Sequence, residues 1–125
     1  MAHVTVGDDA VHIRLELLDE VLAFHGGLTI PLAHIQGVST DPVPAVRWHG
    51  ERFGTDLPGI ITAGTFVNWD GHVFYDFRDP DRCVTIRLDH EHYNAVVVQV
   101  DGDKEAVARE IEAARARLAS GAPGG

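Results

Sequence analysis

Two histidines one residue apart are the strongest candidates for metal chemistry in this sequence. His90 and His92 stand on either side of a glutamate, and an aspartate precedes them. On an extended segment, side chains two residues apart point the same way, so both imidazoles could share a zinc or nickel ion. Further ligands would have to come from elsewhere, with His72 and Asp76 as candidates. The alternative is a solvated turn between two strands, which needs no ion.

A second group of polar residues lies in and just before residues 50–59, a stretch without regular periodicity that we expect to be an ordered loop. An acid, a possible base and two guanidinium groups beside aromatic neighbours can form a small pocket for an anion. The residues of this candidate ligand-binding site are Arg47, His49, Arg52 and Asp56. The alternative is a surface network of salt bridges over a well-packed loop.

No arrangement typical of a catalytic nucleophile is present. The only cysteine, Cys83, stands in an apolar strand pattern and cannot form a disulfide within the chain, so we interpret it as a small core residue. No serine lies in a Gly-x-Ser-x-Gly context, and no glycine-rich loop of the phosphate-binding kind is found. We therefore expect a protein that is not an enzyme and uses no cofactor, although catalytic residues far apart in the sequence would escape this test.

The overall charge argues against nucleic acid as a partner. Nineteen acidic residues against ten basic ones give a formal net charge of -9, which repels a phosphate backbone or an anionic lipid surface unless a local basic patch overcomes it. The first residues lack the basic start and apolar segment of a signal peptide. No apolar run approaches the roughly 20 residues of a membrane-spanning helix. A cytoplasmic location is the resulting expectation.

The elements that must position these residues are mainly β-strands. Two β-branched and aromatic runs flank Asp70-Gly71, a dipeptide that tolerates the positive φ angles of a tight turn, so residues 60–77 predict a β-hairpin. Trp69 and Phe74 in this hairpin supply apolar surface for an interaction with a partner, although Trp69 could equally fold back on the protein. A turn or two of helix is predicted within residues 18–24, and strands at residues 11–17, 28–30, 35–40, 45–49, 83–89 and 94–100.

The nearly continuous valines of the last of these strands predict burial on both faces. A helix should follow it, because Val107, Ile111, Ala114 and Leu118 form one apolar stripe at spacings of four, three and four, with Asp103 as the N-cap. Such a stripe needs a sheet to cover. We expect residues 1–10 to be an N-terminal extension, 11–119 the domain, and 120–125 a flexible tail.

Short motifs spread along the chain carry a resemblance to a known family. In order, they are Ile30-Pro31-Leu32 with His34-Ile35, Gly54-Thr55, Pro58-Gly59, Gly64-Thr65 with its aromatic hairpin, Ile86-Arg87-Leu88, and Tyr93-Asn94 before the valine run. Together they make the chain similar to a bacterial pleckstrin-homology (PH)-like domain over roughly residues 10–118. The resemblance implies an open barrel of about seven antiparallel strands capped by a C-terminal helix, serving as a binding or assembly module.

The chain departs from the lipid-binding members of that family, which carry several Lys and Arg between the first two strands. The matching stretch, residues 18–27, holds Asp19 and Glu20 and no basic residue, with His25 mostly neutral at pH 7. Phosphoinositide membrane binding is therefore not expected. We expect a non-catalytic PH-like module that acts through protein contacts, including self-association. The alternative is a small-ligand or metal-binding domain that uses the 47–56 segment or the His90 and His92 pair.

Overall fold

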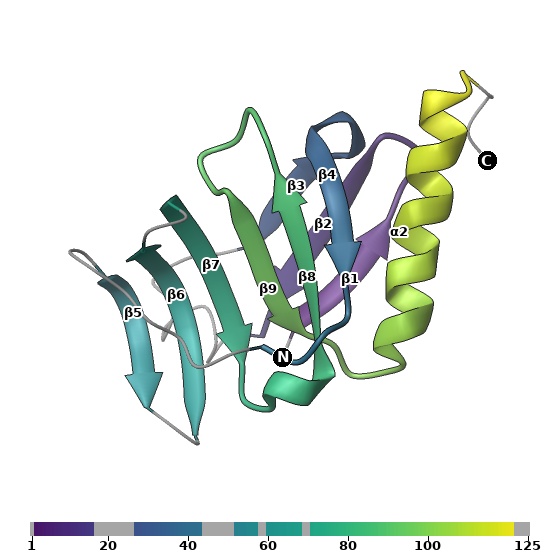
Figure 1. Cartoon of the computed structure of the whole chain (residues 1–125). Coiled ribbons are helices and arrows are strands. Elements are labelled where there is room, and N and C mark those ends of the chain that lie inside the picture. Colours follow the sequence, from purple (N-terminus) through teal and green to yellow (C-terminus); the bar gives the residue numbers. More distant parts are fainter. Residues whose placement is uncertain (1, 17–26, 44–51, 58–59, 69–70, 122–125) are drawn as a thin grey trace.

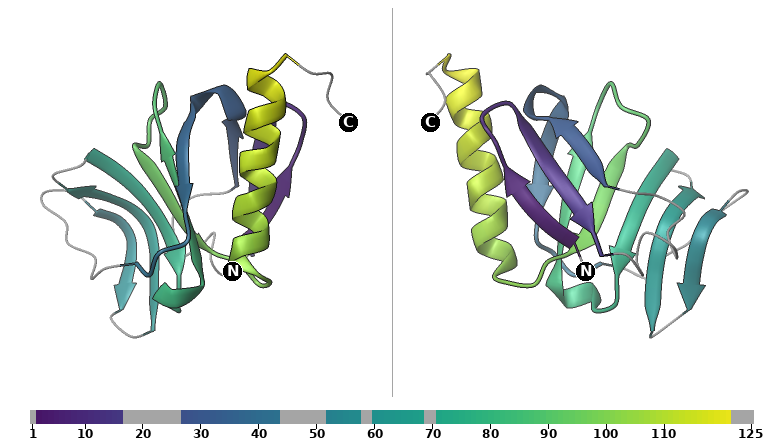
Figure 2. Two further views of the ribbon diagram at one scale, coloured as in Figure 1. Left: turned by 45° about the vertical axis from the view of Figure 1, so that its right-hand side comes forward. Right: turned by 180° about the vertical axis from the view of Figure 1, so that it is seen from behind.

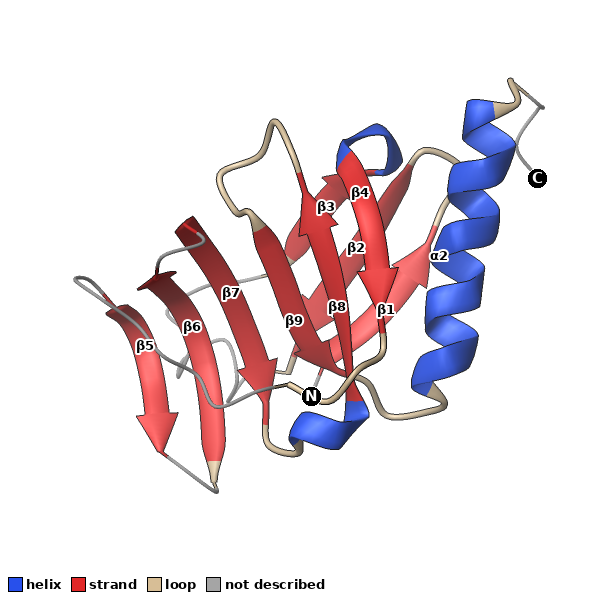
Figure 3. Cartoon of the chain, viewed as in Figure 1, coloured by secondary structure: helices blue, strands red, loops and turns tan. Residues whose placement is uncertain are grey.

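The computed structural model describes residues 2–16, 27–43, 52–57, 60–68 and 71–121. These residues form nine β-strands, two short 3-10 helices and one α-helix (Figure 1, Figure 3). The strands are β1 (Ala2–Val6), β2 (Ala10–Leu15), β3 (Leu28–Pro31), β4 (Ile35–Ser39), β5 (Arg52–Leu57), β6 (Ile61–Asn68), β7 (Gly71–Phe77), β8 (Cys83–Leu88) and β9 (Ala95–Gln99). The helices are η1 (Leu32–His34), η2 (Pro80–Arg82) and α2 (Lys104–Ala119). The predicted mainly β fold with one C-terminal helix is confirmed.

The strands form two sheets. The small sheet has the order β1-β2-β3, and the large sheet has the order β4-β8-β9-β7-β6-β5. The strands therefore do not close into a barrel, and the expected open barrel of antiparallel strands is confirmed only in part. One pair, β7 with β9, is parallel. After β7, the connection through η2 leaves space for one strand between β7 and β8. Strand β9 occupies that space, antiparallel to β8, and therefore runs parallel to β7.

The small sheet packs against one face of the large sheet, and α2 lies beside both (Figure 2). We call this the inner face of the large sheet; its side chains include Phe74, Val96 and Val98. The opposite, outer face carries a second cluster of buried residues: Phe66, Val73, Tyr75, Phe77, Cys83 and Val97. Because alternate residues of β9 belong to the two clusters, its predicted burial on both faces is confirmed.

Helix α2 begins where the sequence predicts. The Asp103 carboxylate accepts a hydrogen bond from the Glu105 backbone N–H at 2.9 Å, as expected of an N-cap. Ile111 and Ala114 are buried in the core, whereas Leu118 is 41% exposed. The apolar stripe therefore faces the sheets through most of its length and leaves them at its C-terminal end.

The predicted hairpin is confirmed, since β6 and β7 pair antiparallel, but the position of its turn is not: Gly71, predicted as a turn residue, pairs with Asn68 and begins β7. Two other segments differ from expectation. The stretch 50–59, expected to be a loop, contains β5, in which Gly54 pairs with Gly64. Gly54 has a φ of 150°, and a Cβ there would collide with the Ala63 carbonyl oxygen, so only glycine fits this close approach of two strands.

The second difference lies at the N-terminus. Residues 1–10 were expected to form an extension, whereas Ala2–Val6 are β1, paired with β2 from Ala2 opposite Leu15. Ala2 is buried in the core, so this strand is part of the folded unit. The helical turn and strand predicted at residues 18–24 and 45–49 lie outside the described residues, as do residues 122–125 of the expected tail.

Replacement of Ile111 by alanine tests the packing of α2. Ile111 is fully buried, so Ile111→Ala should lower the free energy of unfolding by about 2–5 kcal/mol through lost burial and a residual cavity. Leu118→Ala on the same stripe is the matched control and should cost about 1 kcal/mol or less. Urea unfolding followed by circular dichroism measures both, and equal losses would contradict this packing.

The burial of Cys83 predicts an unreactive thiol. Cys83 is fully buried, and its Sγ donates to the Asp79 carbonyl oxygen at 3.4 Å. Burial, reinforced by the Asp79 carboxylate, raises the pKa of the thiol to about 12. At pH 8 only about one molecule in ten thousand then carries the reactive thiolate. Labelling with 5,5'-dithiobis(2-nitrobenzoic acid) should be negligible in the native protein and complete in guanidinium chloride; rapid native labelling would contradict this burial.

Candidate functional site

The predicted metal pair lies in the connection between β8 and β9, but its two imidazoles contact different groups. His90, with a φ of 57°, places Nδ1 3.3 Å from an Asp89 carboxylate oxygen, and its ring centre lies 5.9 Å from that of His34. The His92 ring instead packs against His72, with centres 4.9 Å apart. The positive φ of His90 breaks the extended geometry that would have aimed both side chains in one direction.

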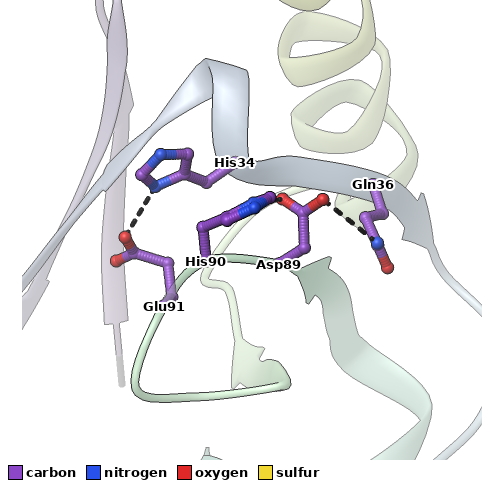
Figure 4. Close-up of polar contacts among 5 residues, drawn as sticks. All are labelled: His34, Gln36, Asp89, His90 and Glu91. Atoms are coloured by element: carbon purple, nitrogen blue, oxygen red, sulfur yellow. Dashed lines mark hydrogen bonds and ion pairs between the residues drawn. The ribbon is translucent and has the colours of Figure 1, made fainter.

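His34, Gln36, Asp89, His90 and Glu91 form a polar cluster that ties this connection to the start of β4 (Figure 4). A His34 ring nitrogen and a Glu91 carboxylate oxygen lie 2.6 Å apart, and the Gln36 amide donates to Asp89 at 3.3 Å. The hydrogen bond from His90, assisted by that from Gln36, holds the pKa of Asp89 below its ordinary value. The cluster fixes the connection in place and brings no third metal ligand to the pair of histidines.

One group of three possible metal ligands occurs elsewhere in the described part of the chain. His3, Glu16 and Asp101 place ligand atoms within 4.8 Å of one another, from β1, the end of β2 and the turn after β9. All three side chains are exposed. Exposed clusters of this kind are common without an ion, and no buried polar group supports this one.

The predicted anion site is described only in part. Arg47 and His49 lie outside the described residues, and Arg52 is described only as part of β5. Asp56 accepts a hydrogen bond from the Thr62 hydroxyl at 3.0 Å, across the pair β5 and β6. The segment that was expected to enclose a ligand is thus in part an edge strand.

The predicted interaction surface needs a correction. Phe74 is fully buried on the inner face, where its ring meets Tyr93 edge-on at 5.7 Å between centres. It cannot contact a partner, because strand alternation turns it toward the small sheet. Trp69 lies outside the described residues. The large apolar side chains that are exposed among the described residues are Leu57, Ile60 and Leu118.

A pocket of about 450 Å³ lies on the outer face of the large sheet. Its volume falls within the range of small-molecule sites. Its lining residues come from four strands, the segment after β4 and the residue before β9: Ser39, Asp41, Pro42, Val43, Val73, Tyr75, Thr85, Arg87, Asn94, Ala95 and Val97. Sequence reasoning missed it because no two of its strands contribute a recognisable spacing motif.

The large sheet ends on β5. This strand pairs with β6 on one side, and no described strand pairs with its other side. At the opposite end of the sheet, α2 lies along β4, and the Arg115 guanidinium donates to the Gln36 carbonyl oxygen at 3.1 Å. A helix therefore covers the β4 edge of the large sheet, whereas no described strand pairs with the β5 edge.

No family model, curated protein or solved structure matches this chain. In the described part of the chain, no helix has both the length and the apolar character needed to cross a membrane.

The polar cluster predicts a pH-dependent contribution to stability. The folded-state pKa of Asp89 lies below its ordinary value of 3.8, so its stabilising contribution is present above that pH and is lost as pH falls through the folded-state value. Asp89→Asn should therefore be less stable than the wild type at pH 6, and the difference should shrink as pH falls below about 4.

Urea unfolding at pH 6 and at lower pH measures this difference. Asp8→Asn is the control, because Asp8 is exposed and makes no hydrogen bond or ion pair with other described residues. A difference between wild type and Asp89→Asn that is the same at every pH would contradict the role given to the Asp89 carboxylate.

Proposed function

We propose that this chain is a non-catalytic, PH-like module that acts through protein contacts, and that it pairs with a second copy of itself along β5. The observation that carries the proposal is the edge of β5, which no described element covers. An uncovered edge presents a row of backbone N–H and C=O groups that can pair with another strand.

The contrast between the two edges of the large sheet supports this role. Along β4, the side chain of Arg115 donates to the Gln36 carbonyl oxygen, and that of Lys104 donates to the Thr40 carbonyl oxygen at 2.7 Å. Both donors belong to α2, so the helix blocks the pairing of another strand at this edge. Among the described strands of the large sheet, β5 is therefore the edge at which a second copy can pair.

The register of the sheet indicates which residues of β5 turn their backbone polar groups outward. Asn68 faces Gly71 across a two-residue connection, where the flanking pair exchanges hydrogen bonds. Alternate residues of β6 therefore bond to β7, and the others, from Ile61 to Val67, bond to β5. By the same alternation along the register of β5 and β6, the outward groups belong to Arg52, Gly54 and Asp56.

The charges of β5 are self-complementary. In an antiparallel pair of two β5 strands with Gly54 opposite Gly54, Arg52 of one copy lies opposite Asp56 of the other, and the same pair recurs by two-fold symmetry. Opposite charges directly across two strands contribute about 0.2–1 kcal/mol per pair. The charge pattern therefore favours this register over neighbouring ones.

Exposed apolar surface adjoins the same edge. Leu57, the last residue of β5, is 48% exposed and Ile60 is 64% exposed. The Ile60 backbone N–H donates to the Leu57 carbonyl oxygen at 2.8 Å, which holds the two residues on one turn. These two side chains add exposed apolar area beside the edge strand, which a partner could bury.

A charge exchange within β5 tests the proposal. Asp56→Arg places Arg opposite Arg twice in the paired strands, and Arg52→Asp places Asp opposite Asp twice, so each should raise the dimer dissociation constant by about tenfold. The double variant Arg52→Asp/Asp56→Arg restores two opposite pairs and should restore the wild-type constant. Sedimentation equilibrium over a dilution series measures all four proteins, with circular dichroism as the check on folding.

Two results would overturn the proposal. One is a wild-type protein that stays monomeric at every concentration tested. The other is a dimer whose dissociation constant is unchanged in both single variants. A dimer that is weakened in both single variants and is not restored in the double variant would contradict the register about Gly54.

A further inference from the structure

We propose that the outer-face pocket binds a small organic anion, an apolar or aromatic body that carries one carboxylate, with Arg87 as the residue that holds the charged group. This proposal is independent of self-association, because none of the described lining residues belongs to β5. Three features of the pocket support it: its floor, the guanidinium group of Arg87 and its hydrogen-bonded walls.

The floor is a flat apolar area built from neighbouring strands. Val73 lies beside Ala95, and Tyr75 lies beside Val97, in the parallel register of β7 and β9. Val73, Tyr75 and Val97 are buried, and all four residues belong to the cluster on the outer face. Such a floor favours a flat hydrocarbon or an aromatic ring over a strongly hydrated ligand.

Arg87 adds a positive charge to the pocket lining, on the β4 side of β8. It pairs with Ala95 on one side and with Gly37 on the other. A Cβ on Gly37 would collide with the guanidinium group, so the missing side chain lets Arg87 lie across β4. Arg87 makes no hydrogen bond or ion pair with any described residue, so its five donors are available to a carboxylate.

The walls of the pocket are held by hydrogen bonds. The Asn94 side-chain oxygen accepts from the His72 backbone N–H at 3.0 Å, and the Asn94 backbone N–H donates to the His72 carbonyl oxygen at 2.8 Å. On the other side, the Val43 backbone N–H donates to the Pro80 carbonyl oxygen at 3.0 Å. A preformed pocket loses less entropy on binding than one that must be ordered.

The balance of charge at the pocket selects the class of ligand. Among the described lining residues, Asp41 is the acidic one and Arg87 the basic one. The guanidinium group of Arg87 can pair with one carboxylate, whereas the carboxylate of Asp41 repels the further charges of a polyanion such as a nucleotide. The apolar floor supplies binding energy, and Arg87 supplies the preference for an acid.

A pair of fluorescent probes of similar shape tests this division of roles. 1-Anilinonaphthalene-8-sulfonate is an aromatic anion, and N-phenyl-1-naphthylamine is its uncharged counterpart. We expect saturable binding of both to the wild-type protein. Arg87→Gln should raise the dissociation constant of the anionic probe about tenfold or more and change that of the uncharged probe by less than about twofold. Arg14→Gln, at an exposed strand position of the small sheet, is the matched control and should change neither.

A second variant locates the bound probes. Ala95→Leu places a larger side chain on the floor of the pocket and should lower the affinity for both probes. Circular dichroism checks that the variant keeps its fold. The proposal is overturned if the wild-type protein binds neither probe in a saturable way, or if Arg87→Gln binds the anion as well as the wild type does. It is also overturned if Ala95→Leu folds and leaves both affinities unchanged, since the probes then bind elsewhere.

Discussion

The burial of β9 on both of its faces is the constraint on which the rest of the structure depends. Val96 and Val98 join the core shared with the small sheet and α2, and Val97 joins the cluster on the outer face. A strand buried in this way must lie inside a sheet, because its backbone groups need partners on both sides. Because β9 lies between β7 and β8, it pairs parallel with β7. The small sheet covers one face of the resulting large sheet, as Figure 2 shows.

The large sheet has one covered face and one covered edge, while its other face and its other edge are left open by the described elements. The inner face is closed by the small sheet, and the edge at β4 is closed by α2. The outer face keeps a pocket whose described lining includes the Arg87 guanidinium group, and no described strand pairs with the outer edge of β5. Both proposals, self-association and the binding of a small acid, therefore use surfaces that the core leaves open.

Local patterns predicted the elements, and non-local pairing decided their arrangement. The hairpin of β6 and β7 and the helix after Asp103 were predictable because turn residues and an N-cap act within a few residues, although Gly71 begins β7 instead of forming the turn. Strand β5 was missed because Gly54 has low strand propensity on its own and fits only against Gly64. Strand β1 carried a usable signal, the alternation of Ala2, Val4 and Val6. The pocket could not be predicted, because Arg87 and its apolar floor meet only through the sheet register.

Hydrogen exchange along β5, measured as a function of protein concentration, tests the central claim most directly. In paired strands the outward backbone amides of Gly54 and Asp56 are hydrogen-bonded across the interface, and their exchange slows as the dimer population grows. The account predicts slow exchange at high concentration and rapid exchange after dilution, with the amides of β9 protected at both. Rapid exchange of the Gly54 and Asp56 amides at every concentration would contradict it.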